Sequence, residues 1–554
     1  MKRWIVLSPL AIPACVAFSW SSWSSLFSGR DFAPADQYVV QAPVETYKPA
    51  LRVAVVGAGA AGSSAALWIH KAAERLEKDI VVDVFERSDY IGGRSTVVYP
   101  YNDTSNDRVE LGASIYVEAN KNMVRAAKEY KLEVSNFNDG DETVGIWDGS
   151  QMLVTTGAKN FFGKIWENIR LLWRYGYRSP VTTNALVKQT VEAFLSIYNK
   201  HTSWDSVEDL SARLNLTDLT AQDGATYLAS QGVGETFAFE VVECATRVNY
   251  AQDLNVIHGL GAMVSMAANG AKGITKGNFH VFEHFLKDSQ AKVHLNTHVT
   301  KLQPKPDGGW VLLATGAAPP TPTPTPADET LDEKKEEDAQ ANIVPPELII
   351  IETYDVVILA APFDTLDIQL PTNLAPVTPA PYVNLHVTLL STKSPTAKHE
   401  YFGLGERDTV PTMVLTTAQG IRAGGKAPEF NSLSYHGRIK EGVDEWVVKI
   451  FSEERIEDEW LAGVFDHVGW VHRKVWDSYP KLPPTTRYNP MKLSDGLYYV
   501  NGFETFISTM ETETVASRGV VDLMLKEMLG DGICPSGVSS PPPEGEEFVW
   551  GWDC

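Results

Sequence analysis

A glycine-rich turn at residues 57–62 constrains the fold of this chain more than any other feature. Its sequence, G-A-G-A-A-G, follows a short apolar run at 52–56 and precedes an alanine-rich run at 60–78. When such a G-x-G-x-x-G turn joins a strand to a helix, the backbone can approach a pyrophosphate, and the helix N-terminus faces its charge. The pattern predicts a Rossmann-type dinucleotide-binding domain. The cofactor-binding residues that it predicts are Gly57, Gly59 and Gly62.

A second apolar run, at 80–85, ends at Glu86. A carboxylate at the end of the second strand of such a unit accepts the hydroxyls of an adenosine ribose and repels a 2'-phosphate. Glu86 is therefore a further predicted cofactor-binding residue, and the cofactor is expected not to be NADP.

The length and composition of the chain limit its class. A chain of 554 residues is too long for one hydrophobic core, so we expect two folded domains. The contents of 44% hydrophobic and 21% charged residues are typical of globular proteins. A formal net charge of -22 excludes nucleic acid as a partner, because an acidic surface cannot release the counterions of a phosphate backbone.

The first twenty residues resemble a secretory signal. Lys2 and Arg3 precede an apolar run at 4–18, and a serine-rich stretch follows at once. A permanent membrane anchor is the weaker alternative, because prolines interrupt the run. Asn102 and Asn215 each begin an N-x-T sequon, which agrees with a secreted protein. We expect residues 1–20 to be a signal peptide and the protein to enter the secretory pathway, ending in a lysosome or vacuole or outside the cell.

Two segments are rich in proline and charge. Residues 317–346 contain Pro-Thr repeats and a charged run, so we predict a disordered insertion between two strand-like runs, 310–313 and 348–351, that pair as a hairpin. Residues 535–554 are proline-rich and acidic, and we predict a mobile tail. The chain has four cysteines; in an oxidising compartment Cys534 can bridge to Cys554, and Cys244 is expected to be a buried packing residue.

The stretch between about 118 and 260 shows mostly helical apolar spacing and is expected to cover a ligand. Its aromatic stripe at 161–173 favours a core helix over a lipid-docking face or a substrate groove. A peripheral membrane contact is an open alternative. If the stripe faces a substrate tunnel, the residues that we expect to line the tunnel are Phe161, Trp166 and Trp173.

Two further motifs indicate a flavin. After the ribose acid, residues 91–94 read I-G-G-R, and residues 110–114 read E-L-G-A-S. Together with a strand-like run at 354–362, these resemble the FAD-containing amine oxidase and GDI-like superfamily. The resemblance implies that FAD is the cofactor. It also implies that Gly93, Arg94, Gly112 and Ala113 contact the flavin dinucleotide.

A narrower resemblance rests on the sequences R-V-N-Y at 247–250, L-Y-Y-V-N at 497–501 and S-T-M-E at 508–511. These blocks resemble the prenylcysteine oxidase family, also called prenylcysteine lyase, whose members are secretory or lysosomal flavoproteins. The resemblance places Glu504 near the ribityl chain. It also directs the N-terminus of a helix beginning near 508, with Thr509, at the flavin N1 and O2 atoms.

The chain departs from the family pattern at two places. Ala251 stands where a glycine is expected, and the stretch 273–278 carries Lys276 where the family has an acid and two glycines. A lysine there is expected to alter the surroundings of the flavin or the choice of substrate.

The resemblance implies oxidation of farnesyl- or geranylgeranylcysteine to a prenyl aldehyde, cysteine and hydrogen peroxide, with molecular oxygen as the acceptor. The C1–H bond of the substrate is allylic and adjacent to sulfur, so both neighbours stabilise the cation left by hydride loss. Positioning then matters more than a protein base. Asn249 and Tyr250 are the catalytic candidates, expected to orient water or the amino acid head. An amine oxidase and a GDI-like prenyl-binding protein without redox chemistry remain alternatives.

The expected fold class is α/β, with a Rossmann-type FAD-binding domain and a second, mixed α+β substrate domain. We assign residues 50–125, 265–365 and 490–530 to the FAD-binding domain, and residues 126–264 and 366–489 to the substrate domain.

Overall fold

A computed structural model of the chain describes residues 50–136, 143–157, 161–199, 203–268, 270–316, 348–406, 408 and 410–554. The predicted signal peptide (1–20) and the predicted insertion (317–346) lie outside the described residues. Residues 49–554 form one compact unit, and both predicted domains lie within it.

The predicted strand-helix-strand unit is present. The glycine turn joins β1 to α1 (Ala60–Leu76), and β2 follows. β1 pairs in parallel with both β2 and β13 in the middle of a six-stranded sheet. The strands of this sheet, in spatial order, are β19 (Lys492–Ser494), β20 (Leu497–Tyr499), β13 (Val356–Leu359), β1 (Leu51–Val56), β2 (Ile80–Phe85) and β9 (Lys292–His294). All six lie in the three segments assigned to the FAD-binding domain.

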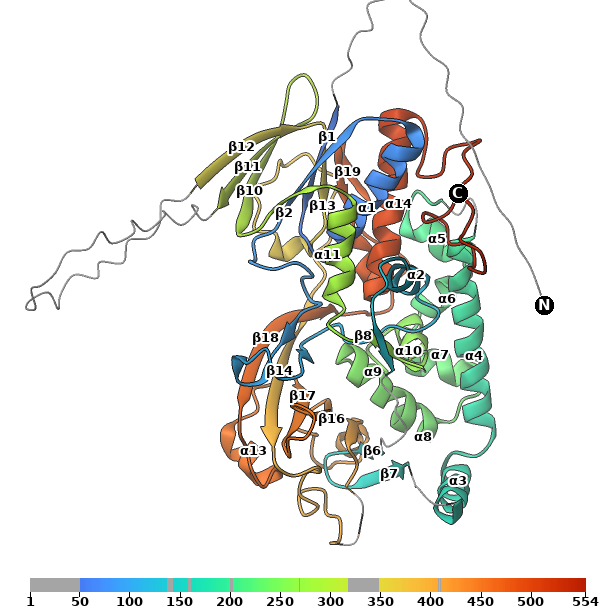
Figure 1. The fold of residues 1–554 in the computed structure, drawn as a ribbon. Coiled ribbons are helices and arrows are strands. Elements are labelled where there is room, and N and C mark those ends of the chain that lie inside the picture. The colour runs from blue at the N-terminus through green and yellow to red at the C-terminus, as the bar shows by residue number, and fades with distance from the viewer. Residues whose placement is uncertain are drawn as a thin grey trace, which may run out of the picture. The chain divides into compact units, whose positions relative to one another are not determined.

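The central strands of this sheet are apolar on both sides because both faces are covered. On one face, α1 packs against α11 (Phe279–Asp288) and α14 (Met510–Leu529), as Figure 1 shows. The other face packs against a three-stranded sheet of β10 (Thr297–Pro304), β11 (Trp310–Gly316) and β12 (Leu348–Tyr354). β11 and β12 are antiparallel, with Gly316 opposite Leu348, which confirms the predicted hairpin.

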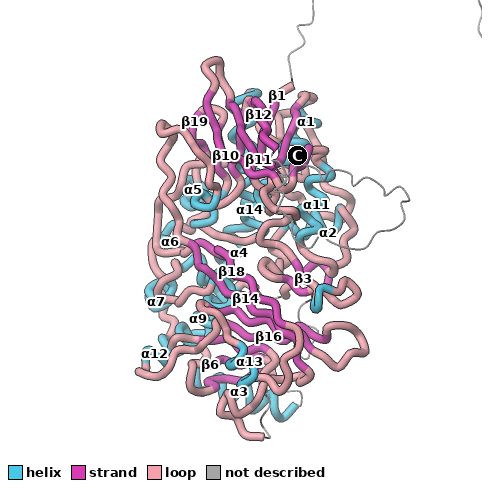
Figure 2. Tube along the Cα trace, turned by 90° about the vertical axis from the view of Figure 1, so that its left-hand side faces the viewer, coloured by secondary structure: helices cyan, strands magenta, loops and turns pink. Residues whose placement is uncertain are grey.

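A seven-stranded sheet, antiparallel except for the β6–β15 pair, forms the second region. In spatial order its strands are β18 (Val471–Pro480), β14 (Tyr382–Thr392), β17 (Trp446–Ser452), β16 (Ser432–Arg438), β15 (Met413–Thr416), β6 (Val144–Trp147) and β7 (Met152–Thr156). These strands come from the segments assigned to the substrate domain. Figure 2 shows β18, β14 and β16 running together, below the strands of the six-stranded and three-stranded sheets.

Helices between α2 and α10 flank both sheets (Figure 1). They are α2 (Lys121–Glu129), α3 (Phe161–Tyr175), α4 (Arg178–Leu195), α5 (Val207–Arg213), α6 (Thr217–Thr220), α7 (Gly224–Ser230), α8 (Glu235–Phe237), the π-helical η3 (Ala238–Val242), α9 (Glu243–Tyr250) and α10 (Gly259–Met266). In the described part of the chain, no helix combines the length and apolarity that a membrane span requires.

Short elements complete the fold. They are the strand pairs β3 (Val97–Val98) with β4 (Val109–Glu110) and β5 (Val134–Asn136) with β8 (Lys272–Ile274), the helices α12 (Gln419–Arg422) and α13 (Asp458–Val464), and the 3₁₀ helices η1 (Pro100–Asn102), η2 (Ser196–Tyr198), η4 (Phe363–Thr365) and η5 (Asn501–Thr505).

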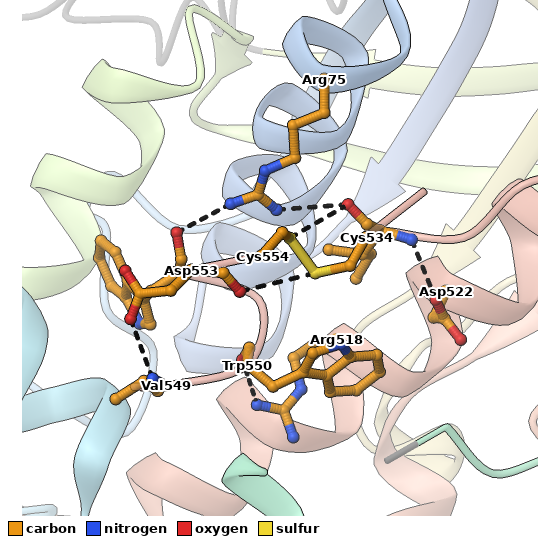
Figure 3. The surroundings of a disulfide bond; sticks show 10 residues. Arg75, Arg518, Asp522, Cys534, Val549, Trp550, Asp553 and Cys554 are labelled. Atoms are coloured by element: carbon orange, nitrogen blue, oxygen red, sulfur yellow. Dashed lines mark hydrogen bonds between the residues drawn. A yellow bond between two sulfur atoms is a disulfide. The ribbon is translucent and has the colours of Figure 1, made fainter. Parts of the chain in front are cut away.

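The prediction of a mobile tail at 535–554 is wrong for its final residues. Trp550 and Trp552 are buried, and a disulfide joins Cys534 to Cys554. Figure 3 shows Arg75 from α1 and Arg518 from α14 reaching this segment; they donate to the carbonyl oxygens of Trp552 (2.8 Å) and Trp550 (2.6 Å). The segment closes the core between α1 and α14, because aromatic burial outweighs the polar composition around it. Cys244 is buried, as predicted.

The aromatic stripe does not form a core helix. Trp166 is 62% exposed and Trp173 is 89% exposed on α3. The side chain of Phe161 lies outside the described residues. Neither described tryptophan lines the cavity discussed below, so their assignment to a substrate tunnel is also wrong.

Candidate functional site

One cavity of about 810 Å³ joins the glycine turn to the seven-stranded sheet. This volume lies in the upper part of the usual range for ligand sites. Its dinucleotide end is lined by the turn, Glu86, residues 92–95 and 112–114. Its opposite end, here called the substrate end, is lined by residues of α4, α9, α10, β16, β17 and β18.

The three glycines of the turn have different physical requirements. A Cβ atom on Gly57 would lie 2.6 Å from the Ala360 carbonyl oxygen, and one on Gly62 would lie 1.8 Å from the Gly57 carbonyl oxygen. Protein packing alone therefore requires glycine at both. At Gly59, the N-cap of α1, the nearest atoms to an added Cβ are 3.9 Å away and its φ of -79° suits any residue. The free space at Gly59 faces the cavity, which fits the close approach of a pyrophosphate.

Glu86 lies at the end of β2 and lines the cavity. Its carboxylate accepts hydrogen bonds from the backbone N–H groups of Ala58 (2.9 Å) and Ser88 (2.8 Å). The carboxylate is thus fixed beside the turn. Its predicted contact with a ribose stays a prediction.

Arg94 forms an ion pair with the buried Glu504 behind the dinucleotide end. Arg94 lines the cavity and also donates to the Ser478 carbonyl oxygen (2.9 Å), whereas Glu504 does not line the cavity. The Glu504 carboxylate accepts from Arg94, from the Tyr382 hydroxyl and from the Asn501 amide (2.8 Å). Glu504 therefore positions Arg94, and its own contact with a cofactor stays a prediction.

The E-L-G-A-S motif at 110–114, here called the third motif, is hydrogen-bonded to the segment 273–278, which departs from the family pattern. Gly93, Gly112 and Ala113 all line the cavity. The side-chain amide of Asn278 donates to the Ala113 carbonyl oxygen (2.9 Å). Lys276, two residues earlier, is exposed and does not line the cavity. The expectation that Lys276 alters the surroundings of the cofactor is therefore wrong, because the turn directs it to solvent.

The N-terminus of α14 completes the dinucleotide end. Thr509 is its N-cap and accepts a hydrogen bond from the Thr512 N–H (3.0 Å). Glu513, in the first turn, is buried and lines the cavity. Burial and the nearby Glu504 raise the pKa of the Glu513 carboxyl, which favours its neutral form.

Several buried polar atoms along the cavity have no hydrogen-bond partner within the described part of the chain. Buried polar groups are normally paired, so such atoms indicate where a polar ligand binds. Those on residues lining the cavity are Ser95 Oγ, Trp476 Nε1, Ser478 Oγ, Asn501 Oδ1 and Glu513 Oε1. Together with the open space at Gly59, they fit a dinucleotide that carries a hydrogen-bonding ring system.

Asn249 and Tyr250, the predicted catalytic residues, both line the substrate end. The Asn249 amide donates to the Ala245 carbonyl oxygen (2.9 Å), so it is held within α9. The Tyr250 ring packs edge-on against Tyr479, with ring centres 5.7 Å apart. The structure brings both to the cavity, but their catalytic roles stay predictions.

The other residues of the R-V-N-Y block support the fold. Arg247 donates to the Asn431 side chain (2.8 Å) and to Thr416 Oγ1 (3.0 Å), which ties α9 to the seven-stranded sheet. Ala251 has a φ of +51°, a left-handed conformation that explains why glycine is expected there.

An apolar wall covers the substrate end between α4 and α10. Its side chains are Val191, Phe194, Leu195, Leu260, Met263 and Val264. Sequence reasoning placed this wall on α3, one helix too early. The apolar spacing of α4 and α10 is a usable signal, but it does not show which face meets the cavity.

Sequence reasoning also missed Lys449, which is buried on β17 and lines the cavity. Its ammonium donates to the Glu110 carbonyl oxygen (2.8 Å) and to Ser114 Oγ (2.9 Å). Burial lowers the pKa of Lys449 and raises the pKa of the neighbouring Glu110 carboxyl. A lone lysine inside the apolar run W-V-V-K-I-F-S at 446–452 is the signal that could have revealed the site.

Comparisons with known proteins agree with this geometry. A family model described as prenylcysteine lyase matches residues 162–532, and a model described as an NAD(P)-binding Rossmann-like domain matches residues 55–130. The chain is 28% identical to the farnesylcysteine lyase of Arabidopsis thaliana, with 90% of this chain and 94% of that protein covered. It is 26% identical to prenylcysteine oxidase 1 of Mus musculus, with 86% and 89% covered.

Among solved structures, the cyclohexylamine oxidase of Brevibacterium oxydans is similar with a TM-score of 0.52 and 14% identity. The match covers 87% of this chain and all of that chain. At this identity the similarity shows the fold alone.

Proposed function

Because this chain belongs to the prenylcysteine lyase family, we propose that it is an FAD-dependent thioether oxidase that cleaves farnesyl- or geranylgeranylcysteine in the degradation of prenylated proteins. The observation that carries the proposal is the single cavity that connects a dinucleotide turn to an apolar wall. Each end alone has other interpretations, but together they hold a redox cofactor beside a long apolar chain.

The overall reaction is the conversion of the thioether, water and molecular oxygen into a prenyl aldehyde, cysteine and hydrogen peroxide. The C1–H and C1–S bonds of the substrate break, and water supplies the aldehyde oxygen. When bound, FAD supplies the acceptor for the hydride of C1, and oxygen takes up the two electrons. The allylic double bond and the sulfur both stabilise the positive charge on C1.

The apolar wall between α4 and α10 provides most of the substrate binding. A farnesyl tail has about fifteen carbons, and each buried CH2 contributes about 0.8 kcal/mol. Phe194, Leu260 and Met263 offer the required surface without a polar group. The wall also excludes bulk water from the reacting carbon, which limits side reactions.

Lys449 keeps a positive charge in the cavity between the third motif and the apolar wall. Two of its N–H groups are directed to the Glu110 carbonyl and Ser114. A fixed cation here would stabilise the negative charge that the departing hydride carries to a bound acceptor, and it would not stabilise the positive charge left on C1. Asn249 and Tyr250 lie at the same end and orient the amino acid head or the attacking water.

An amine oxidase is the rival that shares this fold. A pair of facing parallel rings would favour it, whereas the Tyr250 and Tyr479 rings meet at an interplanar angle of 72°. The family match supports a thioether substrate over an amine. A prenyl-binding protein without redox chemistry is the other alternative, and the unpaired polar atoms along the cavity argue against it.

The proposed location is the secretory pathway, ending in a lysosome or vacuole or outside the cell. The Cys534–Cys554 disulfide supports an oxidising compartment, where such bonds persist. Both sequon asparagines, Asn102 and Asn215, are exposed and can accept a glycan.

The direct test is to incubate the purified, flavin-loaded enzyme with farnesylcysteine in air and to measure peroxide, free thiol and aldehyde. The proposal predicts the three products in equal amounts. Benzylamine and putrescine serve as amine controls and should give no peroxide. Peroxide from an amine but not from farnesylcysteine would establish the amine oxidase alternative, and colourless protein that binds farnesylcysteine would establish the binding protein.

A further inference from the structure

The helix α3 presents an apolar face to solvent. Of the sixteen large apolar side chains that are exposed in the described part of the chain, six lie within residues 166–181. At about 100° per residue, the four on α3 fall within an arc of roughly 120°. These four, here called the α3 face, are Trp166, Ile169, Leu172 and Trp173. Tyr177 (73% exposed) and Val181 extend the exposed surface into the start of α4.

Specific contacts turn this face outward. On the opposite side of α3, Arg174 donates to the Glu240 carboxylate at 2.6 and 2.7 Å, and the Tyr175 hydroxyl donates to it at 2.9 Å. Glu240 is buried, so its ion pair fixes the rotation of α3. The exposure of the two tryptophans therefore follows from the packing of the helix. Figures 1 and 2 both place α3 at the end of α4 that is farther from the six-stranded sheet.

The charge around the α3 face is opposite to that of the whole chain. Residues 161–178 contain one acidic residue and four basic residues, one of which, Arg174, pairs with Glu240 on the opposite side, whereas the chain has a net charge of -22. Arg170 and Arg178 are exposed beside the apolar arc. A helix with arginines flanking tryptophan and leucine matches the requirements of the headgroup region of an anionic bilayer. An acidic protein surface would offer the arginines a partner but would not require indole rings at its boundary.

We propose that the α3 face docks this enzyme on an anionic phospholipid surface, with Trp166 and Trp173 inserted at the headgroup level and Arg170 and Arg178 on the phosphates. The helix lies on the membrane, and no helix of the described chain is long and apolar enough to cross it.

Docking here would also place the substrate end of the cavity near the lipid. α4 begins at Arg178, beside the α3 face, and its residues Val191 and Phe194 line the cavity. At 1.5 Å per residue, Val181 and Val191 lie about 15 Å apart along the helix. A prenyl chain dissolved in the bilayer would have a short path to the apolar wall. This delivery step rests on the proposed function, whereas the docking surface does not.

The test is co-sedimentation of the full-chain, flavin-loaded enzyme with sucrose-filled vesicles. One set is phosphatidylcholine alone, and the other contains about one third phosphatidylserine. We expect the wild-type enzyme to bind the anionic vesicles at least about tenfold more tightly than the neutral ones, and the W166S/W173S variant to lose at least about tenfold of that binding. Arg170→Glu should weaken binding to anionic vesicles only.

The matched control is I349S/I351S, which removes two other exposed apolar side chains, on β12. This variant should bind vesicles like the wild type. Equal binding by the wild type and W166S/W173S, or no binding by the wild type, would overturn the proposal. A wild-type dimer that W166S/W173S converts to a monomer would also overturn it, because a second copy would then cover the face.

Failure of docking and failure of the proposed function are distinguishable. Without vesicles, W166S/W173S should oxidise soluble farnesylcysteine at the wild-type rate, because neither tryptophan lines the cavity. An enzyme that binds vesicles through the α3 face but oxidises no thioether would leave docking intact and refute the function.

Discussion

The two ends of the cavity are built in different ways. At the dinucleotide end, short consecutive motifs contribute backbone: the glycine turn, residues 92–95 and residues 112–114. At the substrate end, the lining consists of single side chains from six elements that are distant in the sequence. Among them are Phe194 on α4, Met263 on α10 and Lys449 on β17. A cofactor shared by many enzymes is held by local sequence, whereas the selection of the substrate depends on tertiary packing.

This difference has a consequence for mutation. At the dinucleotide end, a substitution should weaken cofactor binding, so that little active enzyme remains for kinetic measurements. At the substrate end, it should leave the cofactor in place and change rate or affinity. The following four predictions test that division.

Gly59→Val should have the largest effect, with loss of more than about 100-fold in FAD affinity. The branched side chain would occupy the space that the pyrophosphate needs, although it meets no protein atom closer than 3.9 Å at Cβ. The apoprotein should therefore fold, as circular dichroism would show, but remain colourless. Gly463→Val is the matched control, because nothing lies within 4 Å of an added Cβ there. Full flavin content in Gly59→Val would place the cofactor elsewhere.

Lys449→Met should reduce the rate of substrate oxidation about 100-fold and leave flavin content unchanged. Burial lowers the pKa of Lys449 from its ordinary 10.5, so in the wild type the cation is present at low pH and is lost as pH rises through the lowered pKa. The wild-type rate should fall with pH in that range, and the variant should lack this decline. Lys474→Met, at an exposed lysine that also lines the cavity, is the control. An unchanged pH profile in Lys449→Met would remove Lys449 from the mechanism.

Phe194→Ala should raise KM for geranylgeranyl- and farnesylcysteine by about tenfold with kcat nearly unchanged. Removing the ring takes away apolar contact that is equally present in the bound and reacting states, which is worth about 1–3 kcal/mol. Glu192→Ala, an exposed substitution on the same helix, should change neither constant. A fall in kcat with unaltered KM would mean that Phe194 positions the reacting carbon instead.

The smallest effect is expected from replacing residues 317–347 with Asn-Gly. Gly316 and Leu348 are direct partners in the antiparallel β11–β12 pair, so a two-residue turn can join them. Flavin content and turnover should match the wild type, and the melting temperature should shift by no more than a few degrees. Loss of turnover at full flavin content would show that the insertion contributes to the substrate end.

Much of the dinucleotide end could be predicted from the sequence. The strand, the turn, the helix and Glu86 are consecutive, so local rules were sufficient to place them. The predicted strand at 80–85 matches β2, and the predicted helix at 60–78 differs from α1 by two residues.

The substrate end could not be assembled in the same way. The neighbours of Lys449 are Glu110 and Ser114, more than three hundred residues earlier in the chain, and only the packing of that segment against β17 brings them together. The α3 stripe was misplaced for a related reason. Apolar spacing identifies a helical face, but the ion pair between Arg174 and Glu240 decides which way that face points. At the C-terminus, proline and acid content predicted mobility, whereas two tryptophans and a disulfide bury the final residues.

The central claim is that the cavity oxidises an allylic thioether at C1. The measurement that tests it most directly is anaerobic, single-turnover bleaching of the enzyme's yellow absorbance by S-farnesylcysteine and by its fully saturated analogue. Both should bind, because the apolar wall contacts either chain. Only the allylic substrate should bleach the flavin rapidly, since only its double bond stabilises positive charge at C1 beside the sulfur. Equal bleaching rates for the two chains, or no bleaching by either, would contradict the account.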